Sequence, residues 1–108
     1  MLSQLPLQEV GLWEAWIEYD QLHPTQFGTL YVLGEILTGN ASGTIVSKAI
    51  NMENRELRLH VSGITGSRNR LKEVLYSEPV ANLDQYTSVS IYANQELIAF
   101  IDEIEVLI

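Results

Sequence analysis

Residues 12–20 read Leu-Trp-Glu-Ala-Trp-Ile-Glu-Tyr-Asp, and their alternation sets the expectation for the whole chain. One parity is apolar while the other carries the acids: Trp13, Ala15, Ile17 and Tyr19 against Leu12, Glu14, Trp16, Glu18 and Asp20. Successive side chains of a β-strand point to opposite faces, whereas the apolar residues of a helix recur every three or four positions. The stretch therefore predicts a half-buried strand.

The chain beyond this strand repeats the same kind of pattern. Residues 29–38 are rich in β-forming residues and contain Gly34, whose place inside a strand suggests a bulge or the close approach of another backbone. The other predicted strands are residues 44–50, 55–62, 86–93 and 96–108. Turn-forming clusters follow residue 38 and residue 50, so they predict two hairpins in succession, which is a meander.

Residues 67–79 fit two structures. A helix over about 68–77 would have Ser67 as its N-cap, an apolar stripe beginning at Leu71, and Pro79 as its end. A strand over the same residues would lie at the edge of a sheet, because proline has no N–H to donate to a neighbour. Two arginines in the first turn would oppose the helix dipole, so the strand is preferred and the helix is the alternative.

Seven strand-like segments with turn residues between them predict an all-β fold, an antiparallel β-sandwich or barrel of about seven strands. The alternative is an α+β fold that contains the one short helix over about 68–77. The chain has 108 residues, which is the usual size of one domain. Residues 1–108 are therefore predicted to form a single β domain.

Charge is distributed unevenly along the chain. The fourteen acids and six bases give a net charge of −8, yet every Lys and Arg lies in residues 48–72. That segment carries +4, while residues 1–47 carry −5 and residues 73–108 carry −7. Nucleic-acid binding needs a basic surface, so an acidic chain predicts no nucleic-acid partner. The central segment leaves a local anion site open.

Composition also limits the chemistry and the location. The chain has no Cys, which excludes disulfides and thiolate metal sites, and its two His have no recognisable zinc spacing. No cofactor and no metal are expected. The longest apolar run, residues 97–101, is far too short for a membrane span, and the N-terminus lacks a charged, apolar leader. We therefore expect no membrane partner and a cytoplasmic location, with secretion as the alternative if a leader was removed.

The most suggestive polar stretch joins a glycine-rich turn to three bases. An anion or an acidic partner would be held there by Gly63, Gly66, Ser67, Arg68, Arg70 and Lys72. Glycine-rich turns expose backbone N–H groups, and arginine donates two hydrogen bonds to one carboxylate or phosphate. The spacing matches neither the P-loop nor the dinucleotide motif. A solvated loop explains the same residues.

Two apolar features predict contacts with protein. Trp13 and Trp16 fall on opposite faces of the first strand, so if Trp13 is in the core then Trp16 points outward between acids and could anchor a partner. Residues 97–101 are apolar on both parities, as in a central strand or in an edge strand that pairs with a second subunit. Trp16 is the candidate partner-binding aromatic.

These observations favour a non-enzymatic binding or assembly module. It would use strand edges or a sheet face to hold a protein partner or a second copy of itself, including a homodimer. The alternatives are a small-anion-binding domain built on residues 63–72 and, more weakly, an enzyme that uses carboxylates and His60. His23, which precedes a proline, is the only other imidazole, and no residue is assigned as catalytic.

Overall fold

The computed structural model describes residues 12–20, 22, 26–38, 45–62 and 70–107. Those residues form eight β-strands and no helix. The strands are β1 (Glu14–Tyr19), β2 (Gly28–Thr38), β3 (Ile45–Asn51), β4 (Glu56–Ser62), β5 (Arg70–Val80), β6 (Ser88–Ala93), β7 (Glu96–Ile101) and β8 (Glu105–Leu107). The predicted all-β class is confirmed, and the helix alternative is wrong.

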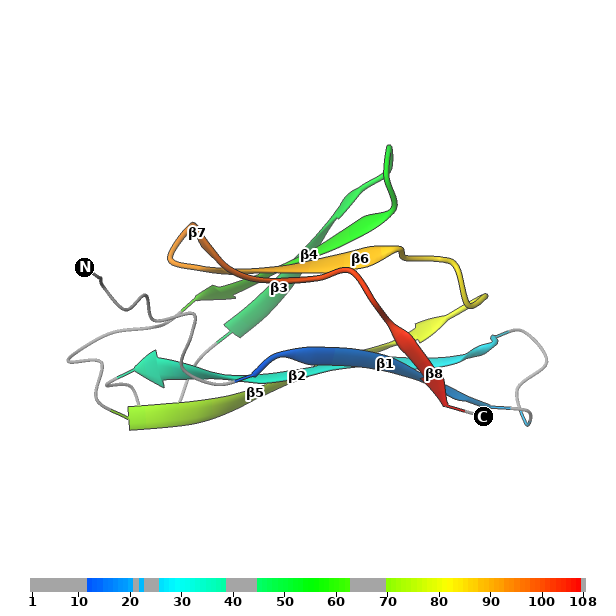
Figure 1. The fold of residues 1–108 in the computed structure, drawn as a ribbon, viewed down its shortest axis with the longest axis horizontal. Coiled ribbons are helices and arrows are strands. Elements are labelled where there is room, and N and C mark those ends of the chain that lie inside the picture. Colours follow the sequence, from blue (N-terminus) through cyan, green and yellow to red (C-terminus); the bar gives the residue numbers. More distant parts are fainter. Residues whose placement is uncertain (1–11, 21, 23–25, 39–44, 63–69, 108) are drawn as a thin grey trace.

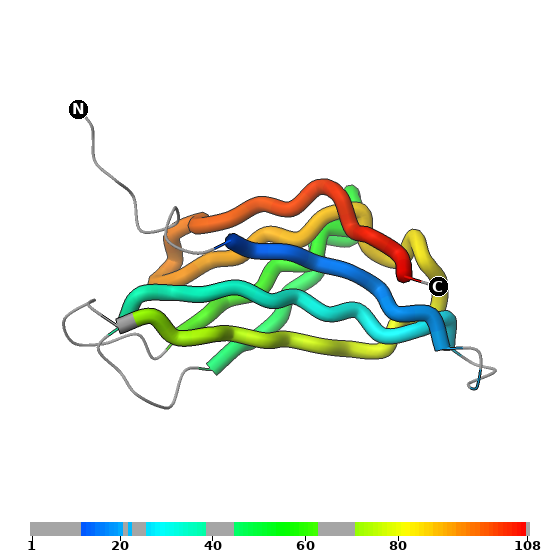
Figure 2. Tube along the Cα trace, turned by 60° about the horizontal axis from the view of Figure 1, so that its bottom comes forward, coloured from blue at the N-terminus to red at the C-terminus, as the bar shows by residue number. Residues whose placement is uncertain are grey.

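The strands build two four-stranded sheets that lie as two layers (Figure 1). The first sheet has the order β5-β2-β1-β8, and Figure 2 shows these four strands side by side. The second sheet has the order β3-β4-β6-β7. Each sheet contains one parallel pair, β1 with β8 and β4 with β6, and its other pairs are antiparallel. The arrangement is a β-sandwich with mixed sheets.

The core lies between the sheets, and its buried apolar side chains come from one parity of β1, β2, β4, β5 and β6, together with Tyr86 and Ile98. Along β2 the buried side chains include Leu30, Val32 and Ile36, and β4 contributes Leu57 and Leu59. The remaining buried apolar residues are Ala15, Ile17, Val61, Val74, Val80, Tyr86, Val89, Ile91 and Ile98. Burying an aliphatic side chain of this size stabilises a fold by about 1.5–3 kcal/mol, so this layer holds the sheets together.

Residues 70–80 form a strand because their whole length pairs with β2. The register runs from Arg70 opposite Thr38 to Val80 opposite Gly28. β5 lies at the edge of the first sheet, as Pro79 led us to expect. The inward parity of β5 places Val74 and Val80 in the core, which a helix over these residues would not do.

Two expectations about connectivity are wrong. β2 and β3 were expected to form a hairpin, but they lie in different sheets, and β2 pairs with β1 and β5 instead. Residues 96–108 were expected to form one extended segment, but it divides into β7 and β8, which belong to opposite sheets. Ile104 lies between them and packs against the core. The chain therefore crosses from the second sheet to the first between Ile101 and Glu105.

Two tight turns contain residues with positive φ. Asn94 and Gln95 join β6 to β7, and both have positive φ, 52° and 68°. A two-residue hairpin with both central residues at positive φ matches the right-handed twist of the strands it joins. The turn between β3 and β4 ends at Arg55, which also has positive φ. These turns fix the register of the second sheet.

Candidate functional site

One surface carries two half-buried aromatic rings, Trp16 and Tyr31, and three exposed leucines, Leu71, Leu75 and Leu107, and we call it the outer face. It is the side of the first sheet that points away from the core. Alternation along β2, confirmed by its burial pattern, and the registers with β1, β5 and β8 define its members. They are Glu14, Trp16, Glu18, Thr29, Tyr31, Leu33, Glu35, Leu37, Leu71, Glu73, Leu75, Ser77, Pro79, Glu105 and Leu107.

Trp16 lies on this face, as expected, and is half-buried. Its ring stacks on Tyr31 of β2, with the ring centroids 5.5 Å apart and the planes 23° from parallel. Its indole Nε1 donates a hydrogen bond of 3.0 Å to Oε2 of Glu18. Tyr31 and Glu18 therefore fix the orientation of the Trp16 ring, which has one of its two faces against Tyr31. An ordered ring loses little entropy when a partner contacts it.

Leucines extend the apolar area across β2 and β5. Leu33 faces Leu75 across the two strands, and Leu37 faces Leu71. Leu75 is 57% exposed and Leu71 is 49% exposed, although both belong to a strand whose other face is in the core. The Glu35–Glu73 pair lies between these two leucine pairs. Exposed apolar side chains gathered on one face of a folded domain often mark an interaction site.

Among the described residues of the outer face, the acids have no basic counterpart. Five glutamates belong to it: Glu14, Glu18, Glu35, Glu73 and Glu105. No Lys or Arg is among the members defined above. Glu35 and Glu73 are directly opposite each other, and like charges in that position destabilise a sheet.

A hollow of about 340 Å³ lies on this face. It is lined by Leu12, Glu14, Leu33, Gly34, Glu35 and Glu73. Gly34 belongs to the inward parity of β2, and a Cβ built at this residue would lie 2.0 Å from Cδ2 of the Trp13 ring on the core side of the strand. The close approach expected at Gly34 is thus made by a side chain and not by another backbone. Trp13 itself packs against the core, on the opposite side of the strand from Trp16.

The proposed anion site falls mostly on residues that the structure leaves undescribed. Gly63, Gly66, Ser67 and Arg68 lie outside the described residues, and for Arg70 only the backbone is placed, opposite Thr38. Lys72 pairs with Ile36, on the inward parity of β5. An anion site in this segment stays a prediction.

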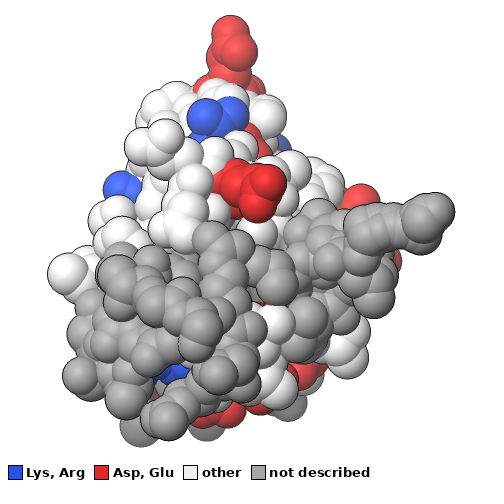
Figure 3. All heavy atoms as spheres, turned by 90° about the vertical axis from the view of Figure 1, so that its left-hand side faces the viewer, with Lys and Arg blue, Asp and Glu red and all other residues white. Residues whose placement is uncertain are grey.

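Three other bases are paired with acids of the same chain. Nζ of Lys48 lies 2.9 Å from Glu78, Nε of Arg58 lies 3.0 Å from Glu56, and Nη1 of Arg55 lies 3.7 Å from Asp84. Basic side chains occupy separate places on the face shown in Figure 3. Much of the positive charge of residues 48–72 is therefore neutralised by carboxylates of the same chain.

Glu78 is the centre of a polar network that joins the two sheets. It lies on β5 with its side chain 10% exposed, and it accepts hydrogen bonds from three residues. Lys48 of β3 donates to Oε1 at 2.9 Å, Tyr76 donates to the same oxygen, and Tyr86 donates to Oε2 at 2.7 Å. The sequence contained one indication of this role, because Glu78 shares its parity with buried Val74 and Val80.

The network changes the acidity of each member. Burial raises the pKa of Glu78, but hydrogen bonds from Tyr76, Lys48 and Tyr86 outweigh it and hold that pKa below the usual 4.5. The hydrogen bond to Glu78 raises the pKa of Lys48 above 10.5. Burial, followed by the hydrogen bond to Glu78, raises the pKa of both Tyr76 and Tyr86. Glu78 is thus an anion held by three donors from two sheets and a connecting segment, which suits a structural tie between the sheets.

His60 shows no catalytic arrangement in the part of the chain that is described. Its ring stacks on Tyr92, with the centroids 5.0 Å apart. No hydrogen bond joins it to a described carboxylate. Glu56, four residues earlier on β4, accepts from Ser90 and Arg58, and the hydrogen bond from Ser90 contributes most to lowering the pKa of Glu56. His23 lies outside the described residues.

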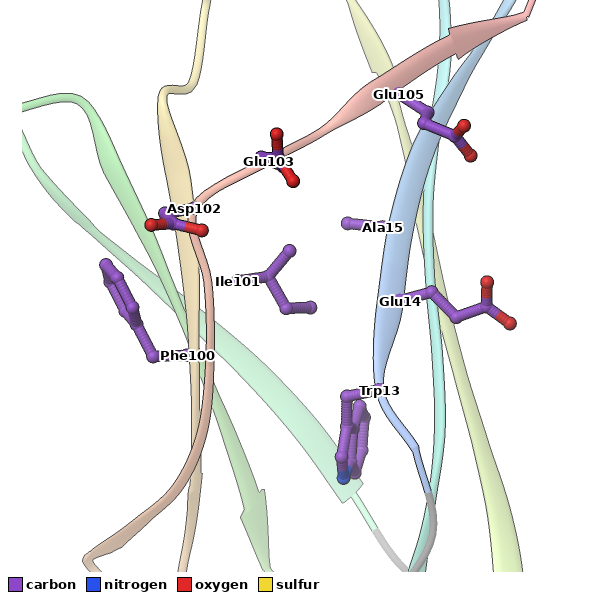
Figure 4. A pocket seen from close by; sticks show the side chains of 8 residues that line it. All are labelled: Trp13, Glu14, Ala15, Phe100, Ile101, Asp102, Glu103 and Glu105. Carbon is purple, nitrogen blue, oxygen red and sulfur yellow. The ribbon is translucent and has the colours of Figure 1, made fainter.

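A second hollow, of about 380 Å³, opens between β1 and the segment that joins β7 to β8. Figure 4 shows Ala15 and Ile101 directed toward each other across it, while Glu14 and Glu105 turn away from Asp102. The carboxylates do not converge. Among the described residues, no group of three or more Asp, Glu, His or Cys is placed to hold a metal ion.

No family model, no curated protein and no solved structure matches this chain. Within the described residues, no helix is long and apolar enough to cross a membrane. Function therefore has to be argued from the surface of the molecule.

Proposed function

We propose that the chain is a non-enzymatic protein-binding module and that the outer face holds the partner. The observation that carries the proposal is the exposure of Leu71 and Leu75 on the same face as the stacked Trp16 and Tyr31, on a sheet whose other side forms the core. Exposed leucines cost hydration free energy at about 25 cal/mol per Å², which a partner that covers them would recover. Aromatic anchors of this kind contribute much of the affinity at protein interfaces.

Charge supports a partner different from the chain itself. A symmetric contact between two outer faces would place five glutamates against five glutamates. Like charges brought together at an interface cost several kcal/mol. The occupant of the outer face is therefore a second protein, and its matching surface is apolar with positive charge.

Site-specific photo-crosslinking tests the proposal. With the photoreactive residue p-benzoylphenylalanine in place of exposed Leu75, irradiation of the cells that naturally produce the chain is expected to give one dominant adduct with another protein. The same residue at Ser47, which is exposed on β3 of the second sheet, is the matched control. Equal adducts from both positions, or none from position 75, would contradict the proposal. An adduct with the mass of two chains would show self-association instead.

The β7 edge supports a second candidate, assembly with another copy. Among the described strands, β7 has a neighbour on one side only, β6, and it contains neither Lys nor Pro. Those residues are the common means of protecting an edge from pairing. Leu97 is 47% exposed and Phe100 is 57% exposed, and Glu96 is the only charge in the strand. Antiparallel pairing of two β7 strands would join two second sheets into one.

Light scattering coupled to size-exclusion chromatography tests the assembly candidate. The chain is expected to have the mass of a dimer at high micromolar concentration. The double substitution Leu97→Lys and Phe100→Lys is expected to give a monomer, because charges on an exposed edge oppose pairing. Leu71→Lys, on the edge strand of the other sheet, should stay dimeric. A wild-type chain that is monomeric throughout would refute the candidate.

A further inference from the structure

Cross-strand neighbours divide part of the outer face into bands. Three successive rows, two residues apart along each strand, read leucine, glutamate, leucine: Leu33 with Leu75, Glu35 with Glu73, and Leu37 with Leu71. We call them the binding rows. Rows two residues apart in a strand are separated by about 7 Å. The hollow that Glu14, Leu33, Glu35 and Glu73 help to line lies at the first two rows.

The glutamate row lowers the stability of the chain when no partner is bound. Glu35 and Glu73 lie directly opposite each other, and neither has an ion pair with a described basic side chain. Like charges that are directly opposite each other destabilise a sheet. Adjacent leucines lower the local polarity and so reduce solvent screening. A cation brought by another molecule would turn this repulsion into attraction.

We infer, on the basis of the proposed function, that the partner presents an extended segment with a basic residue between two apolar residues, in the pattern apolar-x-basic-x-apolar. Side chains on one face of an extended segment are also about 7 Å apart, so they match the binding rows one for one. A strand packed on a sheet lies within about 30° of the strands below it, which preserves this match.

The hollow explains why the central residue is Lys or Arg. Both have an apolar stem that can cover Leu33 and a charged end that stays hydrated or paired. The charged end would lie among the carboxylates of Glu14, Glu35 and Glu73, which line the same hollow. The flanking apolar residues would cover the leucine rows on either side. The segment is thus recognised by apolar contacts at the two leucine rows and by charge at the glutamate row between them.

Fluorescence anisotropy with three labelled peptides tests the inference. Each peptide is a serine-rich segment of about nine residues with two leucines, each two positions from a central residue that is Lys, Gln or Glu. The Lys peptide is expected to bind about fivefold or more tighter than the Gln peptide at low salt, and the Glu peptide least tightly. The advantage of Lys should shrink in about 1 M salt, where exposed charges are screened.

The variant Glu35→Gln/Glu73→Gln identifies the row that reads the charge. It is expected to abolish the advantage of the Lys peptide and to leave binding of the Gln peptide unchanged. Glu96→Gln/Glu103→Gln removes the same number of exposed charges away from the outer face and should keep the advantage. A Lys peptide whose leucines are replaced by serine should bind much more weakly.

Several outcomes would overturn the inference. Equal binding of the Lys and Gln peptides would do so while leaving the proposed function intact, since both would still occupy the leucine rows. Persistence of the Lys advantage in Glu35→Gln/Glu73→Gln would place the cation elsewhere. If the Lys peptide without leucines bound as tightly as the Lys peptide with them, binding would depend on net charge alone and not on the leucine rows. If no peptide binds, the inferred segment is wrong, and the crosslink at Leu75 alone decides the proposed function.

Discussion

Glu78→Gln is expected to lower the free energy of unfolding by about 2–3 kcal/mol. The carboxylate accepts hydrogen bonds from Lys48, Tyr76 and Tyr86, and its side chain is only 10% exposed. An amide accepts through one atom only, so one tyrosine or the lysine loses its acceptor in a place that water reaches poorly. Removing one member of such a network costs more than the network contributed, because the remaining polar groups stay buried without partners.

Glu73→Gln is the matched control on the same strand. Glu73 is exposed on the outer face and opposes Glu35, so neutralising it should change stability by less than about 0.5 kcal/mol. Urea unfolding gives both values, with an unchanged denaturant slope if the two variants unfold as the parent does. Similar losses from Glu73→Gln and Glu78→Gln would contradict the assignment of Glu78 as the tie between the sheets.

The pH dependence of this difference has a definite sign. The pKa of Glu78 is lowered in the folded chain, so its contribution is present above the usual 4.5 and is lost as the pH falls through the folded value. The pKa values of Lys48, Tyr76 and Tyr86 are raised, so their contributions are lost as the pH rises above about 10. The stability difference between the parent and Glu78→Gln should therefore be largest at neutral pH and shrink at both extremes.

Local pattern was sufficient to predict the strands and several of their faces. Alternation placed Trp13 and Trp16 on opposite sides of β1, and the structure confirms both positions. The tight turn at Asn94 and Gln95 was also predictable, because asparagine tolerates positive φ. These features depend on residues that are close in sequence, where period and turn chemistry are informative.

Partner strands could not be predicted in the same way. The glycine-rich cluster after β2 is compatible with a hairpin and with a crossing to the other sheet, and the chain crosses. No Gly or Pro separates β7 from β8 in the sequence, so no strong turn signal marks the change of sheet. The inter-sheet role of Glu78 and the opposition of Glu35 and Glu73 depend on those pairings. Neither feature can be inferred before the pairing of the strands is known.

Gly34→Ala is expected to destabilise the chain by about 2–3 kcal/mol. The new Cβ would lie 2.0 Å from Cδ2 and 2.3 Å from Cε3 of Trp13, so the ring would have to leave its place against the core. The backbone at Gly34 is ordinary extended strand, and alanine fits that conformation as well as glycine does. The whole penalty is therefore assigned to the ring.

A double-mutant cycle with Trp13→Ala separates the ring from every other cause. Trp13→Ala alone should cost about 3 kcal/mol, because it removes a large side chain packed on the core. In that background Gly34→Ala should be neutral or stabilising by up to about 1 kcal/mol, since alanine is less flexible than glycine in the unfolded chain. The resulting coupling of about 2 kcal/mol or more is measurable by urea unfolding. Additive effects would mean that some contact other than Trp13 requires glycine at position 34.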